Sequence, residues 1–90
     1  MLEYENPTAL LGVEVYRVVA TGLLASWRVH PFTIRGILLR HEQTPLFLRN
    51  PHDNYSYGVV LEDLYHTKDE AVATLAVAIQ TEANKLINTI

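Results

Sequence analysis

Residues 23–51 read LLASWRVHPFTIRGILLRHEQTPLFLRNP, and this stretch decides the predicted fold. Two breaks divide it, at His30-Pro31 and at residues 42–45, and each contains a proline. Proline has no backbone N–H and restricts the residue before it, so we expect a strand to end at each break. The segments between the breaks are rich in β-branched, aromatic and leucine residues. They predict three consecutive antiparallel strands, over 23–29, 32–40 and 46–49.

The flanking sequence adds two strands and a helix. Residues 13–20 and 59–65 have strand-like composition, whereas residues 1–12 show little periodicity and predict an irregular arm. Thr67 and Glu70 fit a capping box that begins a helix over 67–88. One apolar stripe at helical spacing predicts the side of the helix that packs on the sheet. Its members are Val72, Leu75, Ala76, Ile79, Ala83, Leu86 and Ile87.

The predicted fold class is therefore α+β: an antiparallel sheet of four or five strands, a meander, with one C-terminal helix packed on it. Ninety residues correspond to a single domain, 1–90, with the arm over 1–12, the sheet over 13–65 and the helix over 67–88. Residues 13–20 are apolar on both strand faces, which favours a homodimer formed through edge strands or through the helix.

Composition narrows the cellular setting and the class of partner. The chain contains no cysteine, no signal peptide is recognised, and no apolar run approaches the ~20 residues that span a bilayer, so we expect a cytoplasmic protein that does not enter a membrane. The net charge of −3 disfavours nucleic acid, but its distribution is uneven. Residues 13–50 hold five arginines and two glutamates, and residues 51–90 hold two lysines and six acidic residues. Such asymmetry can produce a local positive field.

The arginines of the predicted strands suggest a nucleic-acid surface. Arg28, Arg35 and Arg49 are expected on one sheet face with Phe47. On this hypothesis the arginines contact phosphates and Phe47 stacks on bases. The alternative is a solvated face, or ion pairs with carboxylates of this chain or of a second subunit.

Residues 50–58 are dense in turn-forming residues and predict the longest loop. Tyr55 and Tyr57 make this loop a candidate protein-interaction surface, because tyrosine is enriched at such interfaces. The alternative is that both side chains fold back over a thin core.

The sequence shows no pattern typical of a catalytic site or a metal site. The four histidines, His30, His41, His52 and His66, show no metal-ligand spacing, and neither serine lies in a nucleophile elbow. We expect no catalytic residues, no metal, no cofactor and no enzymatic activity.

Several short segments resemble, in order, the SpoVG septation-protein family, over about residues 13–80. They are Ala25-Ser26, Phe32-Thr33-Ile34, Ile37-Leu38-Leu39, the run LFLRNP over 46–51, and Asp63-Leu64-Tyr65-His66 before the capped helix. The resemblance implies a small dimeric regulator that binds DNA or RNA. The alternative hypothesis is a protein-interaction or inhibitor module that acts through Tyr55, Tyr57 and the acidic half of the chain.

Overall fold

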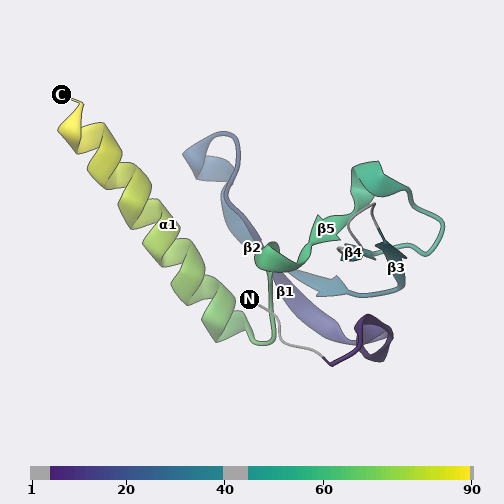
Figure 1. Ribbon diagram of the computed structural model, residues 1–90. Helices are drawn as coiled ribbons and strands as arrows, with labels where there is room; N and C mark the ends of the chain where they lie inside the picture. Colours follow the sequence, from purple (N-terminus) through teal and green to yellow (C-terminus); the bar gives the residue numbers. More distant parts are fainter. Residues whose placement is uncertain (1–4, 40–44, 90) are drawn as a thin grey trace.

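The computed structural model describes residues 5–39 and 45–89 (Figure 1). Within these ranges, six short strands precede one long helix, α1 (Lys68–Asn88). The strands are β1 (Glu14–Val19), β2 (Arg28–Thr33), β3 (Gly36–Leu39), β4 (Pro45–Leu48), β5 (Val59–Val60) and β6 (Leu64–Tyr65). Four 3₁₀ turns complete the order: η1 (Pro7–Leu10), η2 (Leu24–Ser26), η3 (Tyr55–Tyr57) and η4 (Leu61–Asp63).

The strands form two antiparallel sheets of three strands each. Sheet A has the order β2-β1-β6, and sheet B has the order β3-β4-β5. The α+β class is confirmed, but the expected single sheet of four or five strands is not. The predicted strand over 59–65 is divided accordingly, because η4 separates β5 in sheet B from β6 in sheet A.

The chain passes from sheet A to sheet B between two adjacent residues. The backbone N–H of Ile34 donates to the carbonyl of Val13 at 3.0 Å, whereas that of Arg35 donates to the carbonyl of Leu48 at 2.8 Å. The predicted strand over 32–40 is therefore two strands, and Arg40 lies outside the described residues. Gly36 permits the crossing, since a Cβ there would lie 3.0 Å from Pro51 Cα. This close approach is one of the roles expected of a glycine within a strand.

The predicted strand over 23–29 is wrong, and so is the break at His30-Pro31. Residues 24–26 form η2, and β2 begins only at Arg28. Pro31 lies inside β2, paired with Tyr16. Because β2 is at the edge of sheet A, a residue without an N–H is tolerated there. Leu23 is 80% exposed at the connection, so its apolar character does not signal a strand.

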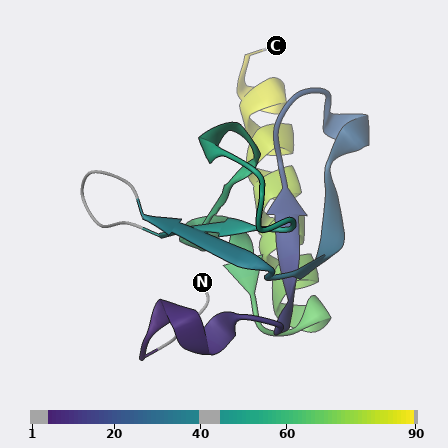
Figure 2. The ribbon, with the colours of Figure 1, turned by 90° about the vertical axis from the view of Figure 1, so that its right-hand side faces the viewer.

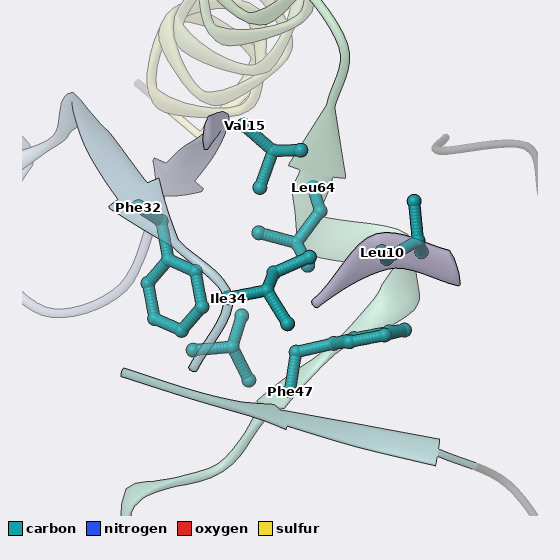
Figure 3. Packing of buried hydrophobic residues seen from close by; sticks show 7 residues of the cluster. Leu10, Val15, Phe32, Ile34, Phe47 and Leu64 are labelled. Atoms are coloured by element: carbon teal, nitrogen blue, oxygen red, sulfur yellow. The ribbon is translucent and has the colours of Figure 1, made fainter. Parts of the chain in front are cut away.

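The hydrophobic core lies between the two sheets (Figure 3). Sheet A contributes Val15, Phe32 and Leu64, and sheet B contributes Phe47 and Val59. Leu10 from η1 and Ile34 from the crossing close the cluster. In Figure 3 the Phe47 ring lies across sheet B and beneath Ile34, within the core.

Helix α1 packs on sheet A, against β1, β2 and β6. Thr67 is its N-cap, as predicted: the Glu70 N–H donates to Thr67 Oγ1 at 3.2 Å, and the Thr67 hydroxyl donates to Glu70 Oε1 at 3.1 Å. In Figure 2 the helix runs alongside β1, and sheet B extends away on the other side. No helix in the described part of the chain is long and apolar enough to cross a bilayer.

The side of α1 that faces the sheet differs from the predicted one. Ala71 is completely buried, whereas Val72, Leu86 and Ile87 are 47%, 55% and 65% exposed. The expected contact therefore holds only for part of the stripe: Leu75 and Ala83 are half-buried, and the other members are exposed. The small side chain of Ala71 allows the helix backbone to approach the sheet, and the exposed aliphatic residues lie to one side of that contact.

Candidate functional site

A cleft of about 380 Å³ lies between sheet A and the segment that joins β4 to β5. Its charged and polar lining includes Arg17 and His30 from the paired strands β1 and β2, Arg28 at the start of β2, and Arg49, Asp53 and Tyr57 from the joining segment. We call the cleft that these residues line the arginine cleft.

The register of β1 and β2 places the sheet A side chains in the cleft. Arg17 pairs with His30, and Val19 pairs with Arg28, so these four residues share one face of the sheet. Val15 and Phe32 continue the same face into the core. The core face of sheet A therefore changes from apolar to basic along its length.

Arg28 is held in place by two neighbours along the chain, His30 in β2 and Ser26 in η2. Its Nε donates to His30 Nε2, and its Nη1 donates to the Ser26 carbonyl at 3.1 Å. The two contacts leave the remaining guanidinium N–H groups of Arg28 for a ligand.

Two asparagines shape the joining segment. Asn50 Oδ1 accepts from the backbone N–H of His52, and Asn54 Oδ1 accepts from that of Ser56, each at 3.0 Å. Asparagine forms such side-chain turns readily, and it thereby competes with extended structure. The turns bring Arg49, at one end of the segment, and Tyr57, near the other, to the same cleft.

The arginine cleft is electropositive. Three guanidinium groups line it against the single carboxylate of Asp53. Within residues 5–39 and 45–89, no ion pair joins any of these arginines to a carboxylate. The Nε of Arg17 is buried and has no hydrogen-bond partner among the described residues. A buried donor without a partner costs about 1–3 kcal/mol, so an acceptor in the cleft would be favourable.

The charge of Arg17 also acts on Asp63 in η4, which is not among the residues that line the cleft. Burial raises the pKa of Asp63 above 3.8, the nearby Arg17 charge opposes that rise, and Glu62 adds to it. Desolvation is the largest of the three effects. Burial therefore outweighs the attraction to Arg17 in setting the pKa of Asp63.

The structure separates the predicted site residues. Arg28 and Arg49 line the cleft, but Arg35, although exposed, does not. The prediction that Phe47 stacks on bases is wrong, because Phe47 is completely buried in the core. Tyr57 is 67% exposed and lines the cleft, so the exposed aromatic ring at the cleft is that of Tyr57. The backbone of Tyr55 is in η3, but its side chain lies outside the described part of the structure.

Sequence reasoning missed Arg17 as a site residue. The signal was present, because Arg17 is the single charged residue on the strand parity of Val13, Val15 and Val19. A charged residue on an otherwise buried strand face is uncommon unless a partner compensates it.

The described residues contain no group of three or more histidine, aspartate or glutamate side chains that could hold a metal ion.

No protein-family model matches the chain, and neither a curated protein nor a solved structure matches it.

Proposed function

We propose that this chain is a small non-enzymatic regulatory protein that binds single-stranded DNA or RNA in the arginine cleft. The observation that carries the proposal is the convergence of Arg17, Arg28 and Arg49 beside the exposed ring of Tyr57. Guanidinium groups bind phosphate oxygens through paired hydrogen bonds, and an exposed aromatic ring stacks on a base. The resemblance to the SpoVG family supports the same function.

The size of the cleft favours a single strand over a duplex. A volume of about 380 Å³ is at the small end of the range for ligand pockets and has room for no more than a few nucleotides. Duplex DNA is usually read by a helix or a ribbon of strands that enters the major groove. The arginine cleft is concave and offers neither.

The test is a fluorescence anisotropy titration with short mixed-sequence single-stranded DNA and RNA, at about 50 mM and about 200 mM salt. Binding should weaken at the higher salt because the arginines displace counterions. Arg28→Ala and Arg49→Ala should each weaken binding and lower the salt slope by about 0.7. Arg35→Ala is the matched control, since Arg35 is an exposed arginine outside the cleft.

Three outcomes would overturn the proposal. One is the absence of binding at both salt concentrations, and another is an equal effect of Arg35→Ala and Arg28→Ala. The third is a nucleoside monophosphate that competes as strongly as an oligonucleotide, which would identify a pocket for a small anionic ligand. If a duplex competes better than a single strand, the proposed preference for single-stranded nucleic acid is wrong.

A second candidate function is protein interaction through the η3 segment. The exposure of Tyr57 favours it, because exposed tyrosines contribute strongly to protein interfaces. This function would be supported if the wild-type protein recovers a protein partner in a pull-down, Tyr57→Ala loses that partner, and no oligonucleotide binds.

A further inference from the structure

Helix α1 carries an exposed apolar stripe that is independent of the arginine cleft. Val72, Ile79 and Leu86 recur every seven residues and are 47%, 39% and 55% exposed. Ala76 and Ala83 fall between them, so the spacing alternates between four residues and three. This alternation is the heptad pattern by which two helices pack side by side.

The stripe lies beside the contact of α1 with sheet A. The contact is made around the buried Ala71, one residue before Val72. In Figure 1 the C-terminal half of α1 extends beyond the strands. The radius of gyration, 14.6 Å, exceeds the value of about 12 Å expected for a compact domain of this length. No element within residues 5–39 or 45–89 covers Val72 or Leu86, each about half exposed.

We infer that the stripe pairs with the same stripe of a second copy, with the two α1 helices antiparallel. Alanine at alternate stripe positions lets two backbones approach to about 8 Å, the short end of helix packing distances. A twofold axis at Ile79 would place Val72 of one protomer opposite Leu86 of the partner subunit. The interface is then self-complementary, as a twofold dimer requires.

Charge determines the orientation. Asp69 and Glu70 lie in the first turn of α1, and Lys85 lies near its end. An antiparallel pair brings the acidic end of each helix towards Lys85 of the partner subunit and opposes the two helix dipoles. A parallel pair would bring the acidic ends together.

The polar residues of α1 also favour a second copy of the chain, rather than a membrane surface, as the partner of the stripe. Interfacial helices are rich in lysine and arginine on their polar face. In α1, the two lysines, Lys68 and Lys85, are outnumbered by Asp69, Glu70 and Glu82.

The apolar stripe of a single helix buries an area at the low end of the range for protein interfaces, so the dimer should dissociate on dilution.

Sedimentation velocity over a range of concentrations tests the pairing. Wild-type protein should shift from monomer to dimer as its concentration rises. Ile79→Glu and Leu86→Glu should each weaken the dimer at least tenfold. Val77→Glu is the matched control, because Val77 is 67% exposed but lies about 160° around the helix from Ile79. Circular dichroism of every variant establishes that it is folded.

Engineered cysteines test the orientation, and the natural chain contains no cysteine that would interfere. Ile79→Cys should form an intermolecular disulfide because it lies on the twofold axis. Leu86→Cys alone should not, since two copies of this position would be about 21 Å apart in the antiparallel pair. Adding Val72→Cys to Leu86→Cys should restore the cross-link.

Wild-type protein that stays monomeric at all concentrations would overturn the pairing. A dimer that Val77→Glu and Ile79→Glu weaken equally would also overturn it, and a disulfide through Leu86→Cys alone would overturn the antiparallel orientation. None of these residues lines the arginine cleft, so the helix pairing and the oligonucleotide binding are tested independently of each other.

Discussion

Gly58 lies against Leu46 so closely that a Cβ added at position 58 would come 2.8 Å from Leu46 Cβ. Leu46 is in β4 and is 4% exposed, whereas Gly58 precedes β5 and lines the arginine cleft. The absence of a side chain at position 58 therefore permits β5 to pair with β4, next to the cleft.

Gly58→Ala should lower the free energy of unfolding by about 1–3 kcal/mol, because the added methyl group overpacks a filled site. Chemical denaturation measures the loss. The double variant with Leu46→Gly provides the control, since glycine removes Leu46 Cβ together with the rest of the side chain and so makes room at position 58. Its loss should be smaller than the sum of the two single losses, and strict additivity would contradict the close contact.

Phe47→Ala and Tyr57→Ala should affect different properties. Phe47 is completely buried, so its truncation should cost about 3–5 kcal/mol of stability. Tyr57 is 67% exposed, so its truncation should change stability by less than about 0.5 kcal/mol. Oligonucleotide affinity should instead fall about tenfold with Tyr57→Ala, in the range of one lost base stack.

The control for that pair is Phe47→Leu, which keeps an apolar side chain in the core. Anisotropy titration of this variant should give wild-type oligonucleotide affinity. A loss of affinity equal to that of Tyr57→Ala would contradict the assignment of the aromatic surface to Tyr57.

Thr67→Ala should destabilise the protein by about 1 kcal/mol, because Thr67 Oγ1 satisfies the Glu70 N–H at the start of α1. Thermal unfolding followed by circular dichroism measures the effect. Thr67→Ser keeps the hydroxyl group and should retain most of the stability. If the serine variant were as unstable as the alanine variant, the methyl group of Thr67 rather than its hydrogen bond would be responsible.

Asp63→Asn should stabilise the protein at neutral pH. Burial raises the pKa of Asp63 above 3.8, so the folded protein holds this proton more tightly than the unfolded chain. The contribution of Asp63 to stability is therefore greatest below pH 3.8, and it is lost as the pH rises through the higher folded value. Asparagine cannot ionise, so the advantage of the variant should grow with pH over this window.

Thermal unfolding at a series of pH values measures that advantage. Glu62→Gln is the control: it removes a charge that raises the pKa of Asp63, so it should reduce the pH dependence without abolishing it. An advantage of Asp63→Asn that is largest at acid pH would contradict burial as the dominant cause.

Part of the candidate site could be predicted from sequence. Arg28 and Arg49 were identified as basic residues on strand-forming segments, and both line the cleft. Phe47 was misassigned because strand alternation does not tell which face of a sheet is covered by a second sheet. Arg17 was overlooked because only the pairing with His30 brings it to the other basic residues.

The sequence by itself determined the elements that depend on neighbours along the chain. The N-cap at Thr67, the helix over 68–88 and the asparagine turns of residues 50–56 all arise from contacts within four residues. Tertiary structure decided the division of the strands into two sheets, the position of Pro31 at an edge, and the side of α1 that meets sheet A. The physical reason is that hydrogen bonding between strands and burial of a helix face depend on residues far away in the sequence.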